Sequence, residues 1–170
     1  MADLSVAVAG VAATLFLLAC SAFFSSSETA IFSLPRTWVD EQAEHSERAR
    51  VLQELVADPH RLLVTLLVGN NVVNVAISSI VTVLVTSYLE PGPAVVVATL
   101  VTSTLVLLFG EIVPKSVGLG NAERWAVSVA PVVRAVETLL GPVITVFDIV
   151  TRRIGAVFGS DEAIEEPYID

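Results

Sequence analysis

Three short polar stretches interrupt long apolar runs in this sequence, and all three carry oxygen-bearing side chains. They read SAFFSSSET at residues 21–29, GNNVVN at 69–74 and GEIVPKSVG at 110–118. Hydroxyl, amide and carboxylate oxygens are hard donors, so the cations they favour are Mg²⁺, Ca²⁺ and Na⁺. The apolar runs hold no cysteine pair and no histidine, so zinc or copper fits this chemistry poorly.

The spacing of these residues predicts that they share helix faces. Ser21 and Ser25 are four residues apart, as are Asn70 and Asn74, so each pair lies on one stripe of a helix. Glu111 is the third candidate ligand, because an ionisable residue inside an apolar run is a functional hypothesis by default. Pro114 has no backbone N–H and would free a carbonyl about four residues earlier. The residues alone do not choose between the members of each pair.

The same polar residues could instead have purely structural roles. Serines in apolar helices often bond back to their own backbone, and asparagines can join two helices. Glu28 could pair with Lys115. A hydrolase with Ser25 as nucleophile is the weakest alternative, because only Lys115, at the end of its apolar run, could activate it. We therefore expect a protein that is not an enzyme.

The composition predicts an all-α integral membrane protein. Of the 170 residues, 54% are hydrophobic and 16% are charged, and the mean hydropathy is +0.78. A water-soluble domain of this size does not carry so much apolar surface, so the expected partner is the lipid bilayer. The formal net charge of −9 argues against a nucleic-acid partner.

Apolar runs of sufficient length predict three membrane-spanning helices. We expect a transmembrane domain over residues 1–157 and an acidic tail or linker over 158–170. Short helices at the membrane surface are predicted before the second span, and a juxtamembrane helix after the third. The spans are predicted at about 4–34, 62–89 and 94–113, the surface helices at 36–58, and the juxtamembrane helix at about 121–155.

The basic residues predict the orientation of the chain in a cell membrane. They fall in two blocks, and none lies before the first span or between the second and third. The positive-inside rule therefore predicts an extracellular N-terminus and a cytoplasmic C-terminus. All three polar stretches then lie within roughly 6–15 Å of the cytoplasmic boundary, at about 1.5 Å per residue. The two blocks are Arg36, Arg48, Arg50 and Arg61, then Lys115, Arg124, Arg134, Arg152 and Arg153.

The order and spacing of the motifs resemble a known family. SAFFSSSETAIFSL, LLVGNNVVN and FGEIVPKSVG are similar to the transmembrane domain, once called domain of unknown function 21, of the CorC/cyclin M (CNNM) magnesium transporters. The resemblance covers about residues 4–155 and is closer to the prokaryotic branch, where Glu-Thr-Ala follows the serines.

The resemblance implies a homodimer of three-span protomers with a belt-like juxtamembrane helix. It also implies Mg²⁺ efflux coupled to inward Na⁺, with a dehydrated Mg²⁺ held between the three helices. The implied ligands are Ser21 or Ser25, Asn70 or Asn74, Glu111, and a backbone carbonyl of a turn after Lys115, near Gly118. The family's cytosolic CBS pair, which binds ATP, is not contained in these residues. The alternative function is a Mg²⁺-sensing membrane scaffold that regulates another transporter.

Overall fold

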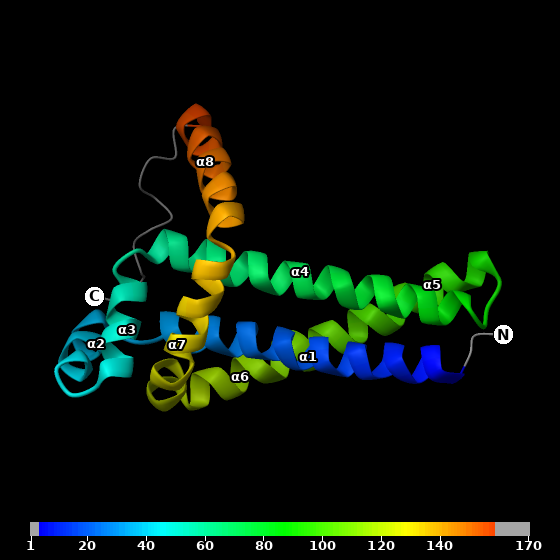
Figure 1. The fold of residues 1–170 in the computed structure, drawn as a ribbon, viewed down its shortest axis with the longest axis horizontal. Coiled ribbons are helices and arrows are strands. Elements are labelled where there is room, and N and C mark those ends of the chain that lie inside the picture. The colour runs from blue at the N-terminus through cyan, green and yellow to red at the C-terminus, as the bar shows by residue number, and fades with distance from the viewer. Residues whose placement is uncertain (1–3, 159–170) are drawn as a thin grey trace. The chain divides into compact units, whose positions relative to one another are not determined.

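The computed structural model describes residues 4–158, and all their regular elements are helices (Figure 1). This confirms the predicted all-α class. The acidic segment 159–170 lies outside the described residues. The helices are α1 (Leu4–Phe32), α2 (Arg36–Ala43), α3 (Glu47–Val56), α4 (Pro59–Thr86), α5 (Pro91–Leu105), the π-helix η1 (Val106–Ile112), α6 (Val113–Gly120), α7 (Ala122–Leu139) and α8 (Gly141–Phe158).

Three stretches are long and apolar enough to span a membrane, as the sequence predicts. They are Leu4–Phe32, Pro59–Thr86 and Pro91–Gly120, and the last runs through α5, η1 and α6 without a break. It continues to Gly120, whereas the sequence predicts an end near residue 113. The turn expected after Lys115, near Gly118, is therefore displaced: helix continues to Gly120 and the turn comes at Asn121.

The segment predicted as one juxtamembrane helix over 121–155 forms two helices. Ala122–Leu139 and Gly141–Phe147 meet at a bend of 74°, and this pair would make a fourth span only if it crossed as one broken helix. Gly141 and Pro142 stand at the bend. Proline has no N–H to donate and disfavours the helical conformation in the residue before it, which accounts for the break.

The chain divides into two compact units. The first contains Met1–Ser26 and Gly69–Val117, and the second contains Ser27–Val68 and Gly118–Asp170. The first unit thus holds most of α1, α4 from Gly69 onward, and the third span as far as Val117. The second unit holds α2, α3, α7 and α8 with the ends of the first two spans.

The core of the first unit joins α1, α4 and α5. Leu18, Ile77, Val81 and Ala98 form one buried cluster. A Cβ on Gly10 would meet the Leu84 side chain at 2.8 Å, so the beginning of α1 also lies close to the end of α4. The pairing of residue 10 with 84 and of 18 with 77 shows that α1 and α4 run antiparallel.

An ion-pair cluster ties together the elements of the second unit. Glu137 on α7 is buried, with 6% of its surface exposed. Its carboxylate accepts a hydrogen bond from Arg61 Nε on α4 and another from Arg134 Nη1 at 2.9 Å. Arg134 Nη2 also reaches Glu54 Oε2 on α3 at 3.3 Å. Beside this cluster, Ile144 of α8 packs on Val64 and Val68.

Candidate metal-binding site

Ser21, Asn70 and Asn74 meet in the first unit. Ser21 Oγ lies 3.0 Å from Asn70 Oδ1 and 2.8 Å from Asn74 Oδ1. One hydroxyl hydrogen can be donated to only one of these oxygens at a time, so three oxygens converge and share a single proton. Either a cation or the rotation of one amide satisfies such a group. Ser21 is fully buried, and both asparagines are half-buried.

The helices bring these groups together for local reasons. Thr14, Leu18, Ser21 and Ser25 follow one another at helical spacing and are all buried, so they form the inward stripe of α1. Gly69 opens the polar stretch of α4, and a Cβ there would meet the Phe24 ring at 2.7 Å. The missing side chain lets α4 approach α1 just before Asn70.

The third span reaches the same point through its π-helix. A Cβ on Gly110 would lie 2.7 Å from Ser21 Oγ and 3.4 Å from Ser21 Cβ, so the backbone of η1 packs directly against that serine. The N–H of Val113 donates to the carbonyl of Leu108, five residues earlier. Pro114 follows at once and has no N–H for the α-helical bond to Gly110. π-Helical turns within α-helices occur frequently at functional sites.

Glu111 lies beside this meeting point in the chain. It is half-buried in η1 and directly follows Gly110. It therefore supplies a carboxylate next to the residue that touches Ser21. Its role as a ligand stays a prediction.

The remaining predicted ligands lie elsewhere on the same helices. Ser25 is fully buried on α1, one turn after Ser21. Gly118 is buried in the last turn of α6, where its carbonyl accepts a long bond of 3.4 Å from the N–H of Asn121. Gly118 belongs to the second unit, whereas Ser21, Asn70, Asn74 and Glu111 all belong to the first. The ligand roles of Ser25 and Gly118 stay predictions.

Several hydroxyls away from this point have purely structural bonds. Ser26 Oγ donates to the carbonyl of Phe23 at 3.1 Å, and Ser79 Oγ donates to that of Val75 at 2.9 Å. Such bonds within one helix need no ligand. Glu28 and Lys115 are both half-buried, and their pairing stays a prediction.

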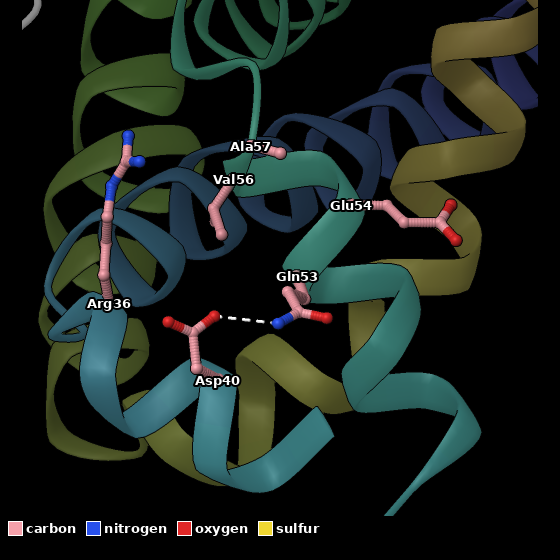
Figure 2. Close-up of a pocket in the computed structure, with 6 residues that line it drawn as sticks. All are labelled: Arg36, Asp40, Gln53, Glu54, Val56 and Ala57. Carbon is pink, nitrogen blue, oxygen red and sulfur yellow. Dashed lines mark hydrogen bonds between the residues drawn. The ribbon is translucent and has the colours of Figure 1, made fainter. Parts of the chain in front are cut away.

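A hollow lies at α2 and α3, and both polar and apolar residues line it (Figure 2). Its carboxylates are already engaged. Asp40 accepts a hydrogen bond of 2.8 Å from Gln53, and Glu54 pairs with Arg134. The Arg36 side chain extends away from Asp40 (Figure 2). Nowhere in residues 4–158 do three histidine, cysteine or acidic side chains gather in a metal-binding group. The meeting point at Ser21 is thus the better candidate for a cation.

Comparison with known proteins decides the family. The model of the cyclin M transmembrane N-terminal domain, CNNM, matches residues 12–170. This chain belongs to the CNNM family. The CNNM match covers most of the first span, all of the second and third, and every predicted ligand, so the resemblance seen in the motifs is confirmed. CNNM is a family of membrane domains and not a known class of enzyme.

Curated relatives of this CNNM chain come from a plant and from bacteria. A DUF21 domain-containing chloroplast protein of Arabidopsis thaliana is 38% identical over 154 residues, which is 90% of this chain and 23% of that protein. The UPF0053 inner membrane protein YfjD of Escherichia coli is 31% identical over 140 residues, 82% of this chain and 32% of that protein. A UPF0053 protein of Haemophilus influenzae is 30% identical over 144 residues, 84% of this chain and 34% of that protein. The chain thus spans about a quarter to a third of their length.

Proposed function

We propose that this CNNM domain carries Mg²⁺ across a cell membrane, with efflux driven by inward Na⁺. The observation that supports the proposal best is the oxygen group at Ser21. In an octahedral Mg²⁺ site the metal–oxygen distance is about 2.0–2.1 Å, so neighbouring oxygens are about 2.8–3.0 Å apart. Ser21 Oγ lies 2.8 and 3.0 Å from the two asparagine oxygens. An O–H···O hydrogen bond has a similar length, so the spacing fits Mg²⁺ without excluding a purely structural contact.

The choice of ion does not rest on this spacing. Ca²⁺ binds oxygens at about 2.3–2.6 Å, and in its common pentagonal-bipyramidal geometry neighbouring oxygens are about 2.7–3.1 Å apart, close to the two distances at Ser21. We propose Mg²⁺ as the preferred ion because the motifs resemble those of magnesium transporters and the CNNM family match agrees with that resemblance. Calorimetry with Mg²⁺ and with Ca²⁺ tests the preference, and tighter binding of Ca²⁺ would overturn it.

The composition of the site suits transport. Ser21, Asn70 and Asn74 contribute neutral oxygens, and Glu111 would contribute a single negative charge. Such a site neutralises Mg²⁺ only in part, so the ion can both enter and leave. Moving two charges against an inside-negative potential costs roughly 4.6 kcal/mol per 100 mV, and inward Na⁺ is the proposed source of that free energy.

The test is Mg²⁺ flux through purified protein in liposomes, with and without an opposing Na⁺ gradient. We expect the wild-type protein to move Mg²⁺ and the gradient to accelerate it. A Mg²⁺ flux that is the same with and without the Na⁺ gradient would refute the coupling to Na⁺ but not the transport of Mg²⁺. Mg²⁺ binding without any flux would favour the alternative, a Mg²⁺-sensing scaffold for another transporter.

A further inference from the structure

Thr102 on α5 is a buried hydroxyl with no partner in the described structure. Only 9% of its surface is exposed, and its Oγ1 makes no hydrogen bond to any residue in 4–158. Other threonines of the spans behave differently. Thr14, Thr82 and Thr99 donate to the carbonyl four residues earlier, at 2.9, 2.7 and 2.8 Å. A buried polar group without a partner costs free energy, so it needs a physical reason.

The contacts of Ala98 and Gly110, which precede and follow Thr102 on the third span, show where Thr102 lies. Ala94, Ala98, Thr102 and Gly110 are the buried residues of the third span up to η1, so they mark its inward stripe. Gly110 packs against Ser21, on the side of the oxygen group. Ala98 packs with Leu18, Ile77 and Val81. Thr102 therefore lies between the oxygen group and this apolar cluster.

The apolar cluster on the far side of Thr102 from Ser21 is buried. Ile77 is fully buried, and Leu18, Val81 and Ala98 are 8%, 4% and 3% exposed. Four close-packed hydrocarbon side chains leave a hydrated cation no polar contact. An ion at Ser21 that leaves toward the α4–α5 turn must pass Thr102 first and then this cluster.

We propose that Thr102 is a positioning residue on the outward path of the ion, and that the Leu18–Ile77–Val81–Ala98 cluster is the barrier that closes this path. The Thr102 hydroxyl offers a cation an oxygen between Ser21 and the barrier. The inference rests on the proposed transport function, but it adds a route and a gate that the ion site itself does not specify.

The test compares three variants of the intact protein in liposomes. Thr102→Val replaces the hydroxyl by a methyl group of similar size, and Thr102→Ser keeps the hydroxyl. The matched control is Thr99→Val on the same helix, where the exposed hydroxyl bonds only to Val95. We expect Thr102→Val to lower the initial rate of Mg²⁺ flux at least tenfold, and Thr102→Ser and Thr99→Val to keep the wild-type rate within about twofold.

Mg²⁺ affinity and thermal stability show whether Thr102 acts on the path of the ion or only in the structure of the protein. Calorimetry should give all variants the Mg²⁺ affinity of the wild type, and thermal unfolding should show Thr102→Val at least as stable, since it loses an unpartnered hydroxyl. Unchanged flux in Thr102→Val, or equal loss in Thr99→Val or Thr102→Ser, would overturn the inference and leave the transport proposal standing. Absence of flux in the wild type would overturn both.

Discussion

At the scale of single residues, Glu111 is the predicted source of negative charge at the candidate site. The hydroxyl and amide oxygens at Ser21, Asn70 and Asn74 are neutral, so Glu111 is the nearby group in the chain that can attract a divalent cation electrostatically. Its neighbour Gly110 touches Ser21 through the backbone. The sign of that charge, rather than the shape of the side chain, is what a substitution should test.

We expect Glu111→Gln to weaken Mg²⁺ binding by at least about a hundredfold. The interaction of one negative charge with a divalent cation in a poorly solvated site is worth several kcal/mol even at an effective dielectric near 20. Each 1.4 kcal/mol is tenfold in affinity. Calorimetry on the folded variant measures it. The control is Glu90→Gln, an exposed carboxylate just before α5 that should bind as the wild type does. Equal affinities for Glu111→Gln and wild type would remove Glu111 from the site.

Elements bring the site residues together by close approach of their backbones. The contact of η1 with α1 depends on Gly110, and that of α4 with α1 depends on Gly69. In the second unit, α7 is joined to α3 and α4 by the carboxylate of Glu137 and the guanidinium of Arg134. Substitutions at Gly110 and at Glu137 test whether these contacts stabilise the packing of the helices.

Gly110→Ala should destabilise the protein, although alanine is normally the better helix former by about 0.5–1 kcal/mol. The new Cβ would stand 2.7 Å from Ser21 Oγ, and overpacking of this kind costs about 1–3 kcal/mol. Mg²⁺ affinity should fall as well, because Ser21 must move. Gly92→Ala is the control, since nothing lies within 4 Å of its added Cβ. Thermal unfolding in detergent should rank Gly110→Ala below wild type, and the opposite order would refute the close contact.

Glu137→Gln should loosen the second unit. The carboxylate is buried and accepts hydrogen bonds from two arginines, one to each oxygen. Glutamine keeps one oxygen acceptor but loses the negative charge, so one of the two hydrogen bonds and both charge interactions are lost. Because Arg61 and Arg134 are 39% and 46% exposed, water screens part of the effect, and we expect a loss of about 1–3 kcal/mol. The control is Glu47→Gln, whose carboxylate is 91% exposed beside Arg50 and should matter little. Denaturant unfolding followed by circular dichroism gives the difference. Equal stability of the two variants would show that the buried pair does not hold α7.

The whole molecule is predicted to cross the membrane three times. Single cysteines in a Cys20→Ser background can be placed at Tyr88, in the turn between the second and third spans, and at Arg48 and Arg153. An impermeant thiol reagent on intact cells should label position 88 and should reach 48 and 153 only after permeabilisation. External labelling at 153 with protection at 48 would mean that the bent pair α7 and α8 crosses as a fourth span.

A homodimer is predicted as well, and α4 offers a face for it. Asn71, Val75 and Ser78 recur at helical spacing and are exposed in the single chain. Hydrocarbon tolerates an exposed amide poorly, whereas a helix interface can bond it. Mass measurement in detergent should give two chains for the wild type and one for Ser78→Trp. The same change at Val8, which is 60% exposed on α1, should leave the dimer intact. A monomeric wild type in every detergent would refute the prediction.

The sequence by itself determined the class of the protein, its three spans and the chemical types of its candidate ligands. Hydropathy over about twenty residues and four-residue spacing are local properties, so they place Ser21, Asn70 and Asn74 on helices and on faces. Pro114 likewise marked the backbone near Gly110 as irregular. These features need no knowledge of how helices pack.

Only the tertiary structure decided which residues meet. Spacing left Ser21 and Ser25 equivalent, but packing puts Ser21 against both asparagines and against Gly110. The π-helix adds a residue to the turn, which rotates everything after it by about 100° relative to an α-helical pattern. The Glu137 cluster joins residues far apart in the chain. Periodicity fixes a face within one helix, whereas the rotation and offset between helices are set by side-chain packing across them.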